Sequence, residues 1–238
     1  MNPNAARITT LGLRPDAKIR ECLPSGIASL DTLLTQGQTQ GFPRGAISEI
    51  LGPESSGRTT LVHSLLAAST AQLEICAYVD TDDSFDPVSA AAAGVALSQL
   101  VWIRCGHNAG HALKAADYLL HAGGFGAIIL DLCQVPARIS NRIPISYWYR
   151  FRRAIENTPT ILALVERERP GRTSGPLGAF SGNSLAKSCA SLMLDVQRKR
   201  TAWRGAPGFE LLRGVELEAA SRTPVRAATA QFKARAIV

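Results

Sequence analysis

A glycine-rich segment carries the clearest chemistry in this sequence. Residues 52–60 fit the phosphate-binding template G-x-x-x-x-G-K-[ST] at every position except Arg58. The glycines let backbone N–H groups turn toward an anion, and the N-terminus of the following helix adds positive charge. Arginine is a bulky planar fork where the template has the compact charge of lysine. The segment predicts a nucleotide-binding loop with an altered phosphate contact, formed by Gly52, Pro53, Glu54, Ser55, Ser56, Gly57, Arg58, Thr59 and Thr60.

Acidic side chains follow the apolar runs that flank this loop. Asp80 and Asp82 end or follow one run, and Asp131 directly follows the apolar residues 127–130. In parallel sheets ligands gather at the carboxyl ends of strands, where a carboxylate can hold Mg²⁺ or direct water. Asp131 fits the second nucleotide-binding motif, which predicts magnesium near Asp131 and the hydroxyl of Thr59. The alternative is an aspartate that only caps the next turn.

The elements needed to position these residues alternate along the chain. Apolar strand-like runs lie at 47–51, 75–79, 100–103, 127–130 and 160–165, and helical patterns at 59–72, 86–93, 110–122 and 145–157. Two later runs, 190–198 and 208–218, are closer together. The pattern predicts an α/β fold, with a mostly parallel twisted sheet, helices on both faces and an antiparallel C-terminal extension. We expect an N-terminal segment (1–24), a core domain (25–225) and a C-terminal tail, flexible in this interpretation (226–238).

Composition excludes several classes of protein. The 238 residues are 46% hydrophobic, enough for one globular core. Apolar runs stay well below the roughly 20 residues that span a bilayer, and residues 1–10 lack the apolar core of a signal peptide. The sequence predicts a cytoplasmic protein without a membrane partner. The five scattered cysteines are expected to be reduced thiols rather than disulfides or zinc ligands.

Charge is distributed unevenly. Residues 1–137 carry 8 basic and 12 acidic side chains, whereas residues 138–238 carry 18 and 7. A basic half rich in arginine favours an anionic polymer or an acidic protein as partner. The simpler interpretation is a solubilising surface.

Four motifs together resemble the RecA family of recombinases. The segment at 52–60 copies the family's GPESSGKTT except for its lysine, and residues 25–34 with 41–45 are similar to the lead-in to that loop. Residues 80–87 resemble the family's D-A-E-H-A-x-D-P, and residues 181–185 followed by Leu194-Asp195 resemble its GGNAL…LD segment.

The resemblance implies a RecA-like core with ATP and Mg²⁺ as cofactors. It places Asp82 where the family has the glutamate that activates water, and Asp86 where an aspartate contacts adenine. It also implies single-stranded DNA as a ligand of two loops. The candidate DNA-binding residues in these loops are Arg138, Arg142, Arg167, Arg169 and Arg172.

Several parts of the ATPase machinery depart from the family pattern together. Arg58 replaces lysine, Asp82 is one methylene shorter than glutamate, and Glu166-Arg167 stand where the family senses the γ-phosphate with Asn-Gln. The family's two C-terminal lysines at the subunit interface have Arg222 as their nearest counterpart. We therefore expect nucleotide binding that is weakened or lost, with little or no ATPase activity.

In this respect the chain is similar to the ImuA-type proteins, which accompany an error-prone polymerase in damage-induced (SOS) translesion synthesis. The resemblance implies a DNA-repair accessory that binds DNA, a recombinase or an error-prone polymerase, as a monomer or in a mixed assembly. The alternative is an active DNA-dependent ATPase and strand-exchange recombinase.

Overall fold

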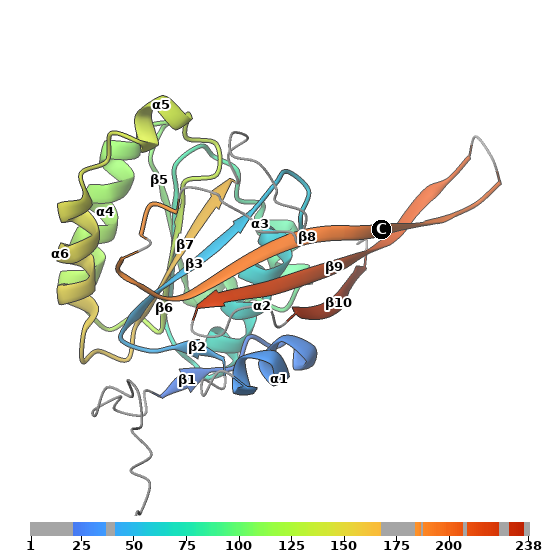
Figure 1. Cartoon of the computed structure of the whole chain (residues 1–238), viewed down its shortest axis with the longest axis horizontal. Coiled ribbons are helices and arrows are strands. Elements are labelled where there is room, and N and C mark those ends of the chain that lie inside the picture. The colour runs from blue at the N-terminus through green and yellow to red at the C-terminus, as the bar shows by residue number, and fades with distance from the viewer. Residues whose placement is uncertain are drawn as a thin grey trace, which may run out of the picture.

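One central sheet organises the molecule (Figure 1). The computed structural model describes residues 21–36, 41–167, 184–186, 188–206, 209–223 and 229–235. Within these residues eight strands form a sheet in the order β10-β9-β8-β3-β7-β6-β4-β5, and β1 and β2 form a separate short pair. The pairs among β3 to β8 are parallel, while β8-β9 and β9-β10 are antiparallel. The predicted fold class is confirmed.

Most of the predicted helices and strands are present, but the last two expected strands have other bounds and several short elements were not predicted. The helices are α1 (Ala28–Gln36), α2 (Arg58–Ala71), α3 (Pro87–Ala92), α4 (Ala109–Ala122), α5 (Ala137–Ser140) and α6 (Ile145–Ile155), with a 3₁₀ turn, η1 (Leu97–Gln99). The strands are β1 (Cys22–Leu23), β2 (Phe42–Pro43), β3 (Ala46–Gly52), β4 (Cys76–Asp80), β5 (Leu100–Arg104), β6 (Ala127–Asp131), β7 (Ile161–Arg167), β8 (Ala190–Arg204), β9 (Leu211–Thr223) and β10 (Thr229–Arg235).

Helices cover both faces of the sheet and bury it. Side chains of α1, α2 and α3 pack in one apolar cluster, and those of α4 and α6 in another on the opposite face. Strands β3, β4 and β6 are buried along their whole length, which explains their nearly unbroken apolar sequences. In α6 the buried residues are Trp148, Phe151 and Ile155, so its aromatic spacing serves the core.

The expected division into an N-terminal segment, a core and a C-terminal tail stays a prediction, and the structure describes only part of the two end segments. Residues 1–20 lie outside the described residues. In the segment expected to be a tail, 229–235 form β10, which pairs with β9 from Thr229↔Ala220 to Arg235↔Gly214. The hydroxyl of Ser29 in α1 also donates to the carbonyl of Gln231 at 2.8 Å. This stretch is therefore part of the sheet, and its apolar residues Ala230, Phe232 and Ala234 alternate with polar ones as in a half-buried strand, a signal that the expected tail overlooked.

Candidate functional site

The phosphate-binding template forms a tight turn between β3 and α2. Gly57 has φ 95°, and a Cβ at this position would lie 2.3 Å from Cδ1 of Leu217 in β9. Glycine is therefore required both by backbone conformation and by the strand that passes over the loop. The N–H of Ser56 closes the turn on the carbonyl of Pro53 at 3.3 Å. The sequence thus folds here as its motif predicts, and α2 begins at Arg58.

Arg58 directs its guanidinium toward the sheet. Nη1 donates to the carbonyl oxygen of Glu166 at 2.6 Å and to Sγ of Cys133 at 3.1 Å. The residue is only 8% exposed. These contacts join the start of α2 to the carboxyl ends of β6 and β7. In the phosphate-binding template the positive charge at this position contacts phosphate, whereas here it bonds a backbone carbonyl of the protein itself.

Cys133 stays a thiol beside this arginine. Burial is the main reason that its pKa lies well above the usual range, and the negative charge of Asp131 raises it further. Arg58 acts in the opposite direction without overcoming these effects. A protonated thiol is a weak nucleophile, so Cys133 contributes packing and a soft hydrogen-bond acceptor rather than reactivity.

Asp131 lies at the end of β6 and is held by three donors. Its Oδ2 accepts from the Tyr78 hydroxyl at 2.7 Å and from Oγ of Ser84 at 3.3 Å, and its Oδ1 accepts from the N–H of Cys133 at 2.9 Å. Burial and this carboxylate together raise the pKa of Tyr78 well above its ordinary value. A carboxylate has about four acceptor positions, and the Cys133 thiol also bonds this one, so little capacity remains for a direct bond to a metal. That arrangement fits an indirect, water-mediated hold on a nucleotide-bound magnesium ion.

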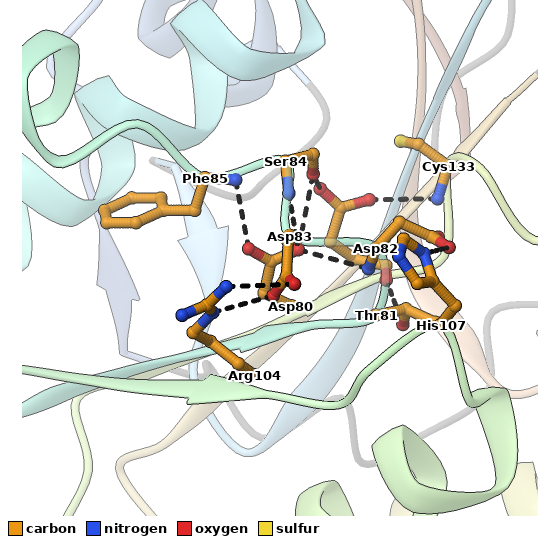
Figure 2. Close-up of polar contacts among 10 residues, drawn as sticks. Asp80, Thr81, Asp82, Asp83, Ser84, Phe85, Arg104, His107 and Cys133 are labelled. Atoms are coloured by element: carbon orange, nitrogen blue, oxygen red, sulfur yellow. Dashed lines mark hydrogen bonds and ion pairs between the residues drawn. The ribbon is translucent and has the colours of Figure 1, made fainter.

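The loop after β4 is organised by Asp80 (Figure 2). This buried carboxylate accepts from the N–H groups of Ser84 and Phe85, both at 3.0 Å, and from Nε1 of Trp102 at 3.1 Å. Two of these bonds hold the turn, and the third ties it to the neighbouring strand β5. Asp80 is therefore the structural centre of the segment that presents Asp82.

Asp82, expected to activate water, is engaged by a histidine. Nδ1 of His107 lies 3.2 Å from Oδ1 of Asp82, and the N–H of His107 donates to the carbonyl of Thr81 at 2.7 Å. Asp83 next to it forms a bidentate pair with Arg104 at 2.8 and 3.0 Å. Both acids at the tip of this loop therefore have cationic or imidazole partners, one from the end of β5 and one from the segment that follows it (Figure 2).

His107 is the site residue that sequence reasoning missed. Helix α4 begins at Ala109, after Asn108, which caps it by accepting from the N–H of His111 at 3.1 Å. His107 therefore lies before the helix. The Asn108 cap was the available signal, because asparagine is favoured at that position.

Asp86, expected to contact adenine, caps α3. Its two oxygens accept from the N–H groups of Val88 at 3.1 Å and Ser89 at 3.2 Å. The Ser89 hydroxyl and these backbone donors lower the pKa of Asp86. The carboxylate stabilises the helix start, and contact with a base remains a prediction.

The predicted DNA-binding arginines lie in two places. Arg138 in α5 and Arg142 just after it are exposed. Arg167 ends β7, where its Nη1 pairs with Oε1 of Glu54 in the phosphate-binding loop at 2.7 Å. Arg169 and Arg172 fall outside the described residues. One candidate DNA contact is thus linked directly to the nucleotide loop.

The two residues predicted to bind magnesium, Thr59 and Asp131, differ in how accessible they are to an ion. Thr59 is exposed at the second position of α2, while Asp131 is buried among its donors. Within the described residues no group of three or more His, Cys, Asp and Glu side chains could hold a metal by itself. Magnesium in nucleotide sites is held largely by phosphates and water, so this donor set suits an ion that arrives with a nucleotide.

None of the described helices is long and apolar enough to cross a membrane.

Comparison with known proteins finds similarity to proteins named RecA. The family model for the RecA N-terminal domain matches residues 4–140 of this chain. RecA of Borrelia duttonii is 39% identical over 121 residues, 51% of this chain and 32% of the relative. RecA of Rickettsia prowazekii is 40% identical over 124 residues, with coverage of 52% and 35%. RecA of Chloroflexus aurantiacus is 29% identical over 201 residues, with coverage of 78% and 56%. The chain spans about a third to just over half of the length of these relatives.

Proposed function

Because this chain belongs to the RecA family, we propose that it is a DNA-repair accessory protein with a degenerate nucleotide site, which acts by binding DNA, a recombinase or an error-prone polymerase. The observation that carries this proposal is the direction of Arg58. Its guanidinium bonds the carbonyl of Glu166 and the thiol of Cys133. To reach a phosphate, it would have to give up a buried hydrogen bond of 2.6 Å.

ATP with Mg²⁺, when bound, would supply phosphate charge and a Lewis acid at the loop. The backbone of residues 52–57 and the Thr59 hydroxyl are the groups that would hold it, with Asp131 orienting water around the metal. In this proposal binding is weak, because the loop lacks the lysine that reaches the outer phosphates. A retained nucleotide would then be a structural ligand.

Hydrolysis is impaired further at Asp82. Its side chain is shorter than the glutamate found at this position in the RecA motif, and its carboxylate already has His107 as a partner at 3.2 Å. A general base must lie within hydrogen-bond reach of the water that it activates. Asp82 would have to leave His107, and its side chain is one methylene shorter than glutamate. We infer little or no turnover.

The finer proposal is a role of the ImuA type, in translesion synthesis during the SOS response to DNA damage in the cytoplasm. Support comes from the coincidence of changes at positions 58, 82 and 166–167 with an intact fold. Function by binding needs the fold and the surface, but not the phosphate chemistry. The net positive charge of residues 138–238 suits binding to DNA or to an acidic partner.

The rival function is that of an active DNA-dependent ATPase and strand-exchange recombinase. The observations that favour it are the well-formed glycine loop and the ordered Asp131 at the end of β6. If Arg58 released the sheet in the presence of nucleotide, an arginine could still neutralise phosphate charge.

Measurements of ATP binding and hydrolysis decide between these two functions. We expect weak binding and a turnover reduced roughly 10²–10³-fold or more relative to an intact RecA, with or without single-stranded DNA. Arg58→Lys should increase nucleotide affinity, because lysine restores the point charge of the template. Arg44→Lys is the matched control, since Arg44 is a largely buried arginine paired with Glu74 away from the loop.

Turnover stimulated by single-stranded DNA to the level of an intact recombinase would reject the accessory function. If Arg58→Lys leaves affinity unchanged, the obstacle lies elsewhere in the pocket, and Arg58 is not what weakens nucleotide binding. An equal gain from Arg44→Lys would show that the effect is not specific to the loop.

A further inference from the structure

The β8–β9 hairpin extends well beyond the sheet to which it belongs (Figure 1). Pairing of β8 with β3 ends at Asp195, and pairing of β9 with β10 ends at Gly214. From there to the turn, β8 and β9 pair only with one another among the described strands. The hairpin therefore presents its end to solvent on a two-stranded ribbon, away from the nucleotide loop.

Four large apolar side chains are exposed at the end of this ribbon. We call them the hairpin tip: Trp203 (56% exposed), Phe209 (83%), Leu211 (70%) and Leu212 (38%). Trp203 lies directly across from Leu212, so these two share a face, while Leu211 lies across from Arg204. A projecting ribbon gains no core packing from such residues. An apolar cluster in that position indicates a surface that is covered by something else.

Two contacts are described on either side of residues 207 and 208, which lie outside the described residues. The N–H of Phe209 donates to the carbonyl of Ala206 at 2.9 Å. Gly205 has φ 135°, and a Cβ there would lie 2.2 Å from the carbonyl oxygen of Phe209. A side chain at position 205 would be strained and would displace the turn. A residue other than glycine at position 205 would therefore alter how Phe209 is presented.

Four exposed arginines of β8 and β9, at and before the tip, have no ion-pair partner among the described residues. They are Arg198, Arg200, Arg204 and Arg213. In the same ribbon Lys199 pairs with Glu218 at 2.8 Å, and Glu216 pairs with Lys233 of β10 at 3.2 Å. Strand edges are commonly protected by charges and bulges, and β8 has irregularities at 198–200 and 202–203. Edge protection explains the arginines, but it does not explain apolar side chains beside them.

We propose that the hairpin tip docks into an apolar groove bordered by Asp and Glu side chains on a partner protein. This inference rests on the proposed accessory function and names the surface by which the partner is held. Aromatic residues and arginine are the types enriched at the centres of protein interfaces. Single-stranded nucleic acid fits less well, because bases stack on aromatic rings and two of the four tip residues are leucines.

Binding to two purified candidates tests the proposal: the recombinase and the error-prone polymerase encoded by the same genome. The tip variant is Trp203→Ser with Phe209→Ser, and its matched control is Tyr118→Ser, an aromatic side chain on α4 that is 74% exposed. We expect the tip variant to weaken binding of one candidate at least about tenfold, as hot-spot truncations do, and the control to leave it unchanged. Thermal melting of each variant verifies its fold.

Two further variants separate shape and charge from the loss of side chains. Gly205→Ala retains all four tip residues but distorts the turn, so it should also weaken binding. Arg204→Glu with Arg213→Glu should slow association and reverse its salt dependence. A photoreactive phenylalanine analogue at position 209 should cross-link to a partner peptide that contains apolar residues and carboxylates.

The outcomes distinguish this inference from the function on which it rests. If one candidate binds the wild-type chain and the tip variant equally well, the tip is not the interface and the accessory function stands. If neither candidate binds the wild-type chain, both fail together. A tip variant that loses affinity for a single-stranded oligonucleotide but not for protein would assign the tip to nucleic acid. A tip variant that abolishes only self-association would assign it to a second copy.

Discussion

At the scale of single residues, Arg58 shows how an exchange of similar charge redirects a site. Lysine at this position could reach outward from the loop as a flexible point charge, whereas the longer, planar guanidinium reaches Glu166 and Cys133 below it. The Glu166 carbonyl lies at the end of β7, so the arginine also holds the edge where nucleotide sensing would take place. The substitution is visible in the sequence, but the direction of the guanidinium depends on the Cys133 thiol and the Glu166 backbone carbonyl, 75 and 108 positions away.

His63 provides a prediction about pH at the same scale. Its ring is buried in α2 and packs edge-on against Phe85, with ring centroids 5.9 Å apart. Burial lowers its pKa below the ordinary 6.5, although Asp86 partly opposes this shift. The unfolded chain therefore binds a proton more readily than the folded one. Stability is lost as pH falls below about 6.5 and through the lower folded-state pKa.

Replacing His63 tests that linkage. His63→Leu should flatten the loss of stability between about pH 7.5 and 5 in urea denaturation, while His111→Leu, an exposed control, should leave it as in the wild type. The pKa values of Asp83 and Asp86 are lowered in the folded chain, so acid also removes the stability that these groups contribute. That loss begins only at about pH 4, where free carboxyl groups titrate, below the range in which His63 acts. An unchanged slope for His63→Leu would contradict the role assigned to its burial.

At the scale of elements, the strands of the parallel sheet could be predicted from the sequence almost residue by residue. Continuous apolar runs bounded by Asp80, Asp131 and Glu166 correspond to β4, β6 and β7. The order of the strands and the partners of their terminal acids come from long-range pairing, which no local pattern encodes. Asp82 and Asp131 could be found as candidates, but not the contacts of Asp82 with His107 or of Asp131 with Tyr78.

The hairpin shows why a local pattern can end before the strand does. The basic residues 198–200 suggest the end of a strand at 198, yet β8 continues to Arg204 because β9 pairs with it throughout. Irregularities at 198–200 and 202–203 shift the alternation of side chains, so the period of two disappears although pairing continues. Neither α1 nor β10 was predicted, and the two contact one another in the fold, as where the Ser29 hydroxyl donates to the carbonyl of Gln231.

The loop after β4 depends on one buried acid, which leads to a prediction at this scale. Asp80→Ala would leave the N–H groups of Ser84 and Phe85 and the indole N–H of Trp102 without their acceptor. We expect a loss of about 2–4 kcal/mol in the free energy of unfolding, because several donors lose one buried charged partner. Urea denaturation followed by tryptophan fluorescence measures it.

Asp83→Ala is the matched control for this loop, since it removes a neighbouring carboxylate whose pairing with Arg104 is at the surface. Its effect should be much smaller. Equal effects of the two substitutions would mean that Asp80 does not organise the turn.

At the scale of the whole molecule, the uneven charge predicts the mode of DNA binding. A surface that neutralises about four phosphates gives a slope of roughly −3 for log affinity against log salt concentration on a single strand. Replacing Arg138, Arg142 and Arg167 by alanine should make that slope shallower by about 2. Replacing Arg152 and Arg153 on the exposed side of α6 is the control. If the control changes the slope and the triple substitution does not, the DNA surface lies on the α4–α6 face instead.

Assembly follows from the same combination of intact fold and altered site. In RecA recombinases, nucleotide lies between neighbouring subunits, and cationic side chains of one subunit contact the phosphates bound by the next. Arg222, the nearest candidate for that task, instead forms a close ion pair with the buried Asp195 between β8 and β9. A side chain held in this way is poorly placed to sense a neighbour's phosphate. We therefore expect a monomer or a mixed assembly with a recombinase, and no long filament driven by nucleotide.

Light scattering of the pure protein with a non-hydrolysable ATP analogue and single-stranded DNA tests this expectation, with an intact RecA as the positive control. The protein should remain small under conditions in which RecA grows into long particles. The edge strand β5 exposes Val101 and Trp102, so a sheet edge is available for contact even without nucleotide. Weak association that ignores nucleotide would be attributable to that edge, whereas growth that requires the analogue would mean that Arg222 or another cation does read a neighbour's phosphate. The latter result would return strand-exchange recombination to first place as the function of this chain.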